Sequence, residues 1–312
     1  MSKTGVRTLE ISPEQGGRRL DNYLSSILKN VPKSFIYRII RRGEVRVNGS
    51  RSRPNTKLAC KDLIRIPPVA EGDTSDPVIS RSIQALVSAS IVFENSAILV
   101  LNKPPGIAVH SGSGLHYGAI DIVRKLRPEH PAIELAHRLD RDTSGCLVFA
   151  KNYPALRRVQ TEMANPDSQK TYLALLDGEF SKKPRLIDLN LSTTRIGGEK
   201  KTIVASDGKH AATEFTLVEH VAGMSLTEAR ISTGRTHQIR VHAVAAGHPV
   251  AGDKKYGDVA LNMRLRNRGL RRMFLHAKSI TLRPDEAQAP ITIEAPIPND
   301  LGNFLSTLRC TR

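Results

Sequence analysis

The chain has 312 residues, enough for about two domains, and its 47 Lys and Arg residues far outnumber its 30 Asp and Glu residues. This excess predicts a polyanionic partner bound through phosphate contacts, a generally basic protein being the alternative. The three cysteines are widely spaced and form no CxxC pair, which argues against disulfides and a zinc site. Because no run approaches the roughly 20 apolar residues of a membrane span and no signal peptide is evident, we expect a cytoplasmic protein without membrane contact.

Residues 18–66 have the pattern of a compact α/β module. Apolar residues recur at helical spacing from Leu20 to Leu28. A second helix is expected to be capped by Ser34 and to end at Gly43. Asn48-Gly49 then predicts a tight hairpin turn before a closing strand.

The positive charge of the chain is concentrated in this module. Residues 18–66 contain 13 Lys and Arg residues against 3 Asp and Glu residues, a net +10 of the total +17. Arg38, Arg41 and Arg42 fall on the second predicted helix. A solvated charged face is the ordinary explanation for such a run, but the acidic residues that would balance it are missing, which favours RNA or DNA binding.

The chain beyond this module alternates strand-like and helical patterns. Strands are expected near 146–150 and 171–176, with a helix over 154–164, and no regular βαβ spacing links them, so we predict an α+β fold. The predicted division is a lead-in at 1–17, the α/β module at 18–66, a linker at 67–90 that begins with Pro67-Pro68, and a larger domain at 91–312.

Three polar segments of the larger domain are candidates for chemistry. Residues 137–145 place Asp140 among several charged side chains just before a strand, residues 233–242 include Arg235 after a glycine, and residues 101–110 place Lys103 before a Pro-Pro-Gly turn. Loops held by a sheet often carry catalytic groups, although charged surface turns look alike in a sequence. The two histidines of the second segment are five residues apart, the wrong spacing for a shared helical metal site.

Together these segments resemble the motifs of the RluA-type pseudouridine synthases. Residues 137–145 look like the HRLDxxTSG signature, residues 102–110 resemble the KPxGxxVH motif, and residues 234–242 resemble the GRTHQIRVH motif. The remaining similarities are to two later family segments, at 252–257 and 275–277, and to the S4 RNA-binding module, at 18–66. One departure is visible, because Cys60-Lys61-Asp62 stands where the S4 pattern usually has a Gly-Asp turn.

The resemblance implies a mixed, largely antiparallel-sheet catalytic domain, a small α/β S4 domain, and isomerisation of uridine to pseudouridine in RNA without a cofactor or metal. It assigns the essential carboxylate to Asp140, which would act either as a nucleophile at C1′ or as a base that promotes glycal formation. Arg235 is the candidate partner that keeps Asp140 ionised and aimed. Tyr172 matches the family's active-site tyrosine, whose ring would stack on the uracil and whose oxygen would help remove the C5 proton.

The same resemblance suggests substrate contacts. Arg138 is suited to filling the gap left by a flipped base, Lys103 to supporting the pocket or contacting phosphate, and Leu275 to forming an apolar wall. Asp142 is interpreted as loop structure. The arginine-rich residues 263–272, together with the S4-like module, would grip a folded RNA.

Several alternatives remain open at this point. The leading substrate is 23S ribosomal RNA or the RNA of the large-subunit precursor, and tRNA is the second candidate. A non-catalytic S4-type ribosome-assembly factor would explain the charge but not the catalytic motifs. A glycosidic hydrolase that uses Asp140 and Asp142 would release free uracil. We expect a monomer without an obligate protein partner.

Overall fold

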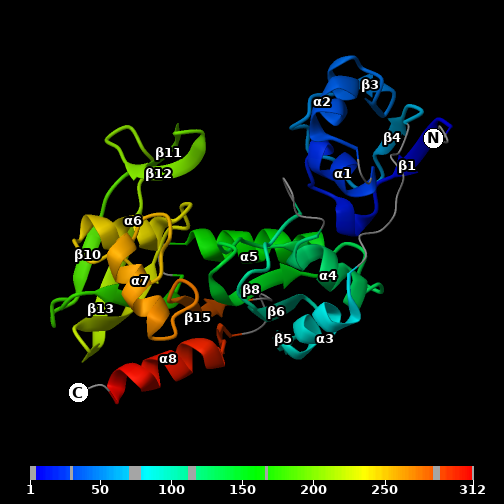
Figure 1. Cartoon of the computed structure of the whole chain (residues 1–312). Coiled ribbons are helices and arrows are strands. Elements are labelled where there is room, and N and C mark those ends of the chain that lie inside the picture. Colours follow the sequence, from blue (N-terminus) through cyan, green and yellow to red (C-terminus); the bar gives the residue numbers. More distant parts are fainter. Residues whose placement is uncertain are drawn as a thin grey trace.

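The computed structural model describes residues 5–28, 31–69, 79–111, 117–165, 168–283 and 289–310. A small α/β module at the N-terminus sits on one side of a larger domain built around an extended sheet (Figure 1). Within the described ranges, no helix is both long and apolar enough to cross a bilayer.

The N-terminal module packs two helices on a four-stranded sheet. Its helices are α1 (Leu20–Ile27) and α2 (Lys33–Arg41), preceded by a short 3₁₀ helix (Pro13–Gln15), and its strands in spatial order are β1 (Arg7–Glu10), β4 (Leu63–Ile66), β2 (Arg46–Val47) and β3 (Ser50–Arg51). Because β1 pairs along its whole length with β4 and Ile11 is fully buried, the described part of the expected lead-in belongs to this module.

The turn residues of the sequence predicted the turns of this module correctly, but the capping residue predicted for one helix is wrong. Gly43, with φ of +70°, follows α2 as predicted, and Asn48 and Gly49 have φ of +49° and +76°, as a two-residue hairpin turn requires. The predicted cap at Ser34 is wrong, since Pro32 is the N-cap and its carbonyl accepts the first helical hydrogen bonds. Proline suits this position for two reasons. Its φ is already restricted, and the backbone N–H that it lacks would have no intrahelical acceptor at the start of a helix.

The larger domain is organised around a ten-stranded sheet. The order along its main path is β10 (Arg185–Asp188), β13 (Ala212–Val221), β14 (Met224–Ile231), β9 (Lys170–Asp177), β15 (Leu275–Leu282), β8 (Ser144–Ala150), β6 (Ile98–Lys103) and β5 (Ile91–Glu94); β16 (Ile291–Glu294) pairs with β15, and β7 (Glu134–Leu135) pairs with β8. Only β15 and β8 pair in parallel among the described strands. This confirms the α+β fold with a mixed, largely antiparallel sheet.

Helices and one hairpin surround this sheet. They are α3 (Arg81–Ala89), α4 (Ala119–Leu126), α5 (Tyr153–Ala164), α6 (Gln238–Ala245), α7 (Val259–Asn267), α8 (Asn299–Arg309) and the hairpin of β11 (Leu191–Ile196) and β12 (Glu199–Val204). The hairpin projects from the end of the sheet on the side that faces the N-terminal module (Figure 1).

Helix α3 lies inside the segment that was expected to be a linker. Its Val87 is fully buried in the same core as Leu99 and Phe149 of the central strands, so the larger domain begins before residue 91. The linker was predicted from the Pro, Gly and Asp residues of 67–77, and the helical spacing of Ile83 and Val87 was not taken into account. Residues 70–78 lie outside the described part of the chain.

Polar contacts of Arg18 and Gly17 join the module to the larger domain. The Arg18 guanidinium lies 3.3 Å from the Glu134 carboxylate, and the Tyr153 hydroxyl donates to the Gly17 carbonyl at 2.8 Å. Gly17 has φ of +83°, and a Cβ there would meet the Tyr153 ring at 3.1 Å. The contact therefore depends on a residue that has no side chain.

Candidate active site

The loop between β7 and β8 carries Asp140 and is fixed at both ends. At its start, the Val148 N–H donates to His137 Nε2 at 3.0 Å, and the Ala136 N–H donates to the Val148 carbonyl. At its end, Gly145 has φ of +111°, and a Cβ there would lie 2.2 Å from the Ala277 carbonyl of β15. Only glycine permits this close parallel pairing, which places the Asp140 loop over β15.

Lys103 ties this loop to the preceding one from within the protein. Its side chain is fully buried, and Nζ donates to the carbonyls of Pro104, Ile107 and Arg141 at 2.9 to 3.0 Å. Burial lowers the pKa of the Lys103 ammonium to about 7. Lys103 thus joins the two loops from inside the protein, and its fully buried ammonium does not reach the surface, so the expected alternative of a phosphate contact is wrong.

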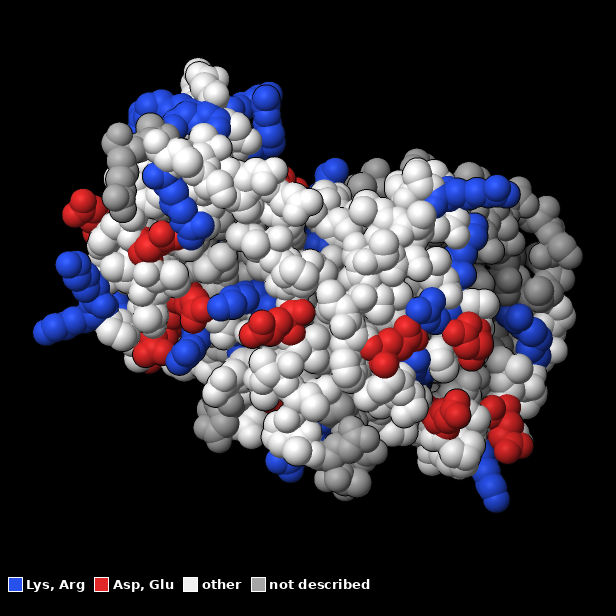
Figure 2. Space-filling model, turned by 90° about the horizontal axis from the view of Figure 1, so that it is seen from below, with Lys and Arg blue, Asp and Glu red and all other residues white. Residues whose placement is uncertain are grey.

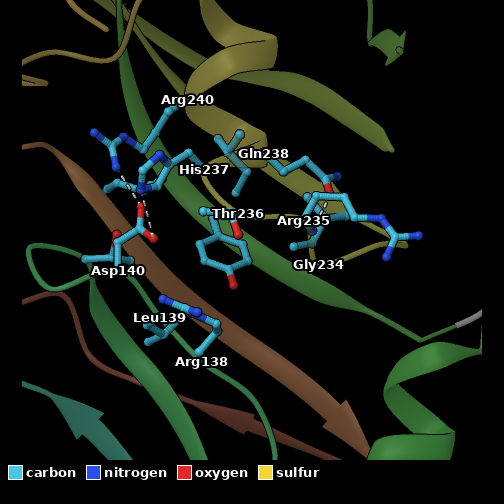
Figure 3. A pocket seen from close by; sticks show the side chains of 14 residues that line it. Arg138, Leu139, Asp140, Gly234, Arg235, Thr236, His237, Gln238 and Arg240 are labelled. Atoms are coloured by element: carbon cyan, nitrogen blue, oxygen red, sulfur yellow. Dashed lines mark hydrogen bonds and ion pairs between the residues drawn. The ribbon is translucent and has the colours of Figure 1, made fainter. Parts of the chain in front are cut away.

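The partner of Asp140 is Arg240, not the expected Arg235. Arg240 Nη1 donates to Asp140 Oδ2 at 2.8 Å, whereas Arg235 Nε donates to the His210 carbonyl at 3.0 Å and its side chain points away from Asp140 (Figure 3). The two arginines belong to the same motif. Arg240 lies in the first turn of α6 and faces the Asp140 loop, while Arg235 precedes the helix.

A second carboxylate, that of Asp253, holds Arg240 in place. Nε and Nη2 of Arg240 donate to the two oxygens of Asp253 at 2.7 and 2.8 Å, and Asp253 is almost fully buried. Burial works against both charges, but their hydrogen bonds and mutual attraction raise the pKa of Arg240 and lower that of Asp253. The guanidinium is therefore a permanent, rigidly oriented cation beside Asp140.

Tyr172 and Leu275 line a pocket next to Asp140. Tyr172 lies on β9, paired with Ala229 of β14 and Ala277 of β15. Burial and the nearby charge of Asp140 raise the pKa of the Tyr172 phenol, so it remains protonated at neutral pH. The residues that line the pocket are Arg138, Leu139, Asp140, Thr143, Tyr172, Ile231, Gly234, Arg235, Thr236, His237, Gln238, Ile239, Arg240 and Leu275 (Figure 3).

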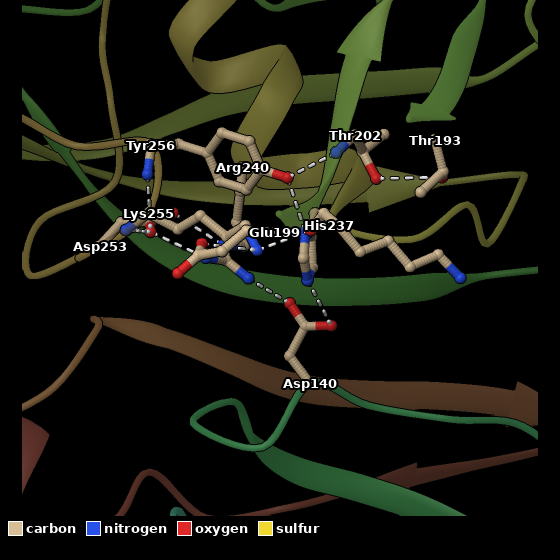
Figure 4. Close-up of polar contacts among 10 residues, drawn as sticks. Asp140, Thr193, Glu199, Thr202, His237, Arg240, Asp253, Lys255 and Tyr256 are labelled. Atoms are coloured by element: carbon tan, nitrogen blue, oxygen red, sulfur yellow. Dashed lines mark hydrogen bonds and ion pairs between the residues drawn. The ribbon is translucent and has the colours of Figure 1, made fainter. Parts of the chain in front are cut away.

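His237 occupies a strained position at the start of α6. Its φ of +54° is left-handed, a conformation that non-glycine residues rarely adopt and that often occurs at functional sites. Nε2 lies 3.8 Å from Asp140 Oδ1, and Nδ1 lies 2.7 Å from the Tyr256 hydroxyl. Figure 4 shows these groups as one continuous set of polar contacts around Asp140.

A second hollow shares Asp140, His237 and Arg240 with the pocket. Its further lining residues include His110 from the loop after β6 and Lys254 and Lys255 from the loop before α7. The carboxylate therefore lies where two hollows meet. One of these hollows is lined by Tyr172 and Leu275, and the other is partly basic.

The basic residues expected on α2 are exposed. Arg38, Arg41 and Arg42 all reach the surface. The Arg38 guanidinium lies 4.6 Å from the centre of the Phe35 ring, and Arg42 lies 3.8 Å from Glu44, which offsets part of its charge.

The departure from the S4 pattern has a simple structural outcome. Lys61 has φ of +71°, the conformation in which the usual glycine is favoured. Asp62 Oδ2 accepts the Ala59 N–H at 2.7 Å, and Oδ1 accepts the Asn48 amide at 2.8 Å. The turn is therefore kept without glycine, at the cost of a strained lysine.

Sequence comparison places this geometry in a known family. The family model described as RNA pseudouridylate synthase matches residues 97–245, and the S4 domain model matches residues 18–64. Ribosomal large subunit pseudouridine synthase C of Haemophilus influenzae is 43% identical over 98% of this chain and 96% of its own length. The chain belongs to the RNA pseudouridylate synthase family. It is a pseudouridine synthase, an isomerase, with an N-terminal S4 domain.

Further relatives agree with this assignment. Ribosomal large subunit pseudouridine synthase C of Yersinia pestis is 44% identical over 97% of this chain and 96% of its own. The solved structure of human RNA Pseudouridylate Synthase Domain Containing 1 is 29% identical, with a TM-score of 0.57, and covers 70% of this chain and 87% of the human one. Human RNA Pseudouridylate Synthase Domain Containing 4, at 22% identity and a TM-score of 0.60 over 73% of this chain and 96% of its own, shares the fold.

Within the part of the chain that the structure describes, no three His, Cys, Asp or Glu side chains gather as a metal site would require. The free cysteines Cys60, Cys146 and Cys310 are not paired with one another. Asp142, expected to be structural, accepts a long hydrogen bond of 3.5 Å from Arg272 at its backbone carbonyl.

Proposed function

We propose that this enzyme converts specific uridines of 23S ribosomal RNA to pseudouridine, with Asp140 as its essential carboxylate. The observation that carries the choice of RNA is the match over nearly the whole chain to relatives named for the ribosomal large subunit. The proposed location is the cytoplasm, and the proposed working form is a monomer without an obligate protein partner. A tRNA substrate is the alternative, and it is an outcome of the test below.

The reaction breaks the C1′–N1 bond, turns the uracil, and joins C1′ to C5, after which C5 loses its proton and N1 gains one. Substrate and product contain the same atoms, so the isomerisation balances without a co-reactant. The Arg240 guanidinium holds Oδ2 of Asp140 at 2.8 Å, and among the described residues the other oxygen, Oδ1, accepts no hydrogen bond, with His237 Nε2 3.8 Å away. That second oxygen is the one available to attack C1′ or to take a proton from the sugar.

The pocket beside Asp140 fits a flipped uracil. The Tyr172 ring and the Leu275 side chain offer a flat face and an apolar wall, and Arg138 is exposed at the same pocket, where it would fill the place the base has left. Because the Tyr172 phenol stays protonated at neutral pH, we assign it stacking and hydrogen bonding, rather than a phenolate base. Arg235 lines the pocket too, and we assign it contact with the RNA in place of its expected pairing with Asp140.

The S4 domain is the proposed binding surface for folded RNA. Its α2 presents exposed Arg38 and Arg41, and no carboxylate of the described residues pairs with either of them. The face of the molecule seen from below, over α3 and α8, instead mixes acidic and basic side chains (Figure 2). Phosphate binding is therefore assigned to the S4 domain and the side of the molecule that carries the pocket.

The test is direct modification of RNA. Purified wild-type protein and Asp140→Asn are incubated separately with unmodified 23S rRNA and with tRNA transcripts, and pseudouridine is mapped by carbodiimide labelling and primer extension. We expect new stops in 23S rRNA with wild type and none with the variant. Stops only in tRNA would overturn the proposed substrate, and equal stops with Asp140→Asn would overturn the role of Asp140.

A further inference from the structure

The hydroxyl of Tyr256 stands between two groups whose hydrogen-bonding roles can be worked out. The Thr202 N–H of β12 donates to Tyr256 Oη at 2.9 Å. A backbone N–H can only donate, so the phenol oxygen is an acceptor in this bond. The phenol proton is then free to be donated, and His237 Nδ1, at 2.7 Å, is the acceptor that the described contacts offer it.

The state of the imidazole follows from which group donates in the bond between Tyr256 and Nδ1. If Nδ1 accepts the Tyr256 proton, a neutral His237 must carry its own proton on Nε2. Burial lowers the pKa of His237, which keeps the ring neutral near pH 7. The Nε2–H group then faces Asp140 Oδ1 at 3.8 Å, whereas the opposite tautomer would turn a lone pair toward the carboxylate.

The backbone keeps the ring in this place. His237 is the N-cap of α6 with a left-handed φ of +54°. Its ring packs against the Tyr256 ring in a T-shaped arrangement, with the ring centroids 5.4 Å apart. Separately, the Lys255 ammonium donates to the Lys200 carbonyl at 2.7 Å. The loop that carries Tyr256 is therefore joined to the β11–β12 hairpin by the Tyr256 bond and, independently, by Lys255, which also lies 3.7 Å from the Glu199 carboxylate (Figure 4).

We propose that His237 is a positioning residue for Asp140, held as the Nε2–H tautomer by Tyr256 and, through it, by the Thr202 N–H of the β11–β12 hairpin. Arg240 fixes Oδ2, and His237 orients Oδ1, the oxygen left for the reaction. The 3.8 Å separation is longer than a hydrogen bond, and catalytic hydrogen bonds commonly shorten when substrate closes the site. The role in catalysis rests on the proposed function, but the tautomer does not.

The tautomer is tested without RNA. Long-range ¹H–¹⁵N spectra of the full-length protein, labelled with ¹⁵N-histidine, distinguish the two neutral tautomers and the imidazolium, and His237→Asn assigns the signal. We expect a neutral Nε2–H ring in wild type and in Lys255→Met, which removes the Lys255 contacts with the hairpin, and a loss of that single tautomer in Tyr256→Phe. An Nδ1–H ring or an imidazolium in wild type at neutral pH, or an unchanged ring in Tyr256→Phe, would overturn the proposal.

The catalytic consequence is tested by kinetics. Tritium release from 23S rRNA labelled at uridine C5 measures kcat and KM, because C5 loses its hydrogen when pseudouridine forms. Asparagine tolerates a left-handed φ but is too short to reach Asp140, so His237→Asn should lower kcat by about 10-fold to 100-fold with little change in KM. His237→Gln, whose amide N–H extends as far as Nε2, should recover part of the loss. A rise in KM alone, or equal losses in both variants, would contradict positioning, whereas inactivity of wild type would instead count against the proposed RNA.

Discussion

Arg240 joins Asp140 to Asp253 through a single guanidinium group, with Nη1 bound to one carboxylate and Nε and Nη2 to the other. Asp253 also accepts the N–H groups of Lys255 and Tyr256. The aspartate at the centre of the chemistry is thus connected through one arginine to the loop that carries Tyr256. A change at Arg240 should therefore affect both the stability of the site and its activity.

Replacing Arg240 with lysine keeps the positive charge but removes the planar guanidinium that binds both carboxylates. A lysine ammonium cannot make two parallel bonds to Asp253 and a third to Asp140 in the same geometry. We expect Arg240→Lys to lower the free energy of unfolding by about 2 kcal/mol and the rate of tritium release by about 100-fold. Urea unfolding and the release assay measure the two effects.

Arg235→Lys is the matched control. The Arg235 side chain makes one described hydrogen bond, to an exposed backbone carbonyl, so the loss of that bond should cost less than about 1 kcal/mol of stability. We expect a clearly smaller loss of activity than in Arg240→Lys. If instead Arg235→Lys abolished activity while Arg240→Lys did not, the pairing expected from the sequence would be correct in the working enzyme.

His137 predicts a pH dependence of stability. Burial, aided by the charge of Lys170, lowers the pKa of His137 to about 4 from its usual 6.5, in keeping with Nε2 as the acceptor of the Val148 N–H. Between these two pH values the unfolded chain binds more protons than the folded one, so the free energy of unfolding falls as the pH drops from 6.5 to 4. The contribution is at most about 3 kcal/mol, and it is fully present above pH 6.5.

Urea unfolding of wild type and His137→Gln at several pH values checks this. Glutamine keeps a side-chain acceptor but does not titrate, so its stability should fall less steeply below pH 6.5. Parallel curves for the two proteins would show that His137 does not titrate differently in the folded state.

The sequence predicted the loop of Asp140 and most of its pocket, because those residues are adjacent in motifs. It did not predict the partner of Asp140, since two arginines of one motif, Arg235 and Arg240, carry the same charge. Choosing between them needs the start of α6 and the position of Asp253, which lies over 100 residues beyond Asp140 in the chain. The part played by His137 was missed for a similar reason, because its partner is a backbone N–H that leaves no trace in side-chain patterns.

Tyr172→Phe separates the ring of this residue from its hydroxyl. Phenylalanine keeps the flat face in the pocket, so we expect RNA affinity to be unchanged and the rate of tritium release to fall. Because the raised pKa keeps the phenol protonated, the pH–rate profiles of wild type and Tyr172→Phe should be parallel between about pH 6 and pH 9. A wild-type rate that climbs with pH while the variant's stays flat would identify a phenolate base instead.

Arg38 on α2 should bind a phosphate group of the RNA and make no base-specific contact. Each phosphate contact contributes about 0.7 to 0.9 to the slope of log K, the binding constant, against log salt concentration. Arg38→Ser should therefore reduce that slope by about this amount for 23S rRNA. It should weaken the binding of unrelated RNAs equally. Arg309→Ser removes the same charge from α8, where Arg309 is paired with Glu219 at 3.1 Å, and should leave the slope unchanged. Filter binding over a range of salt concentrations measures both. Equal effects of the two substitutions would mean that net charge alone attracts RNA, with no specific contact by α2.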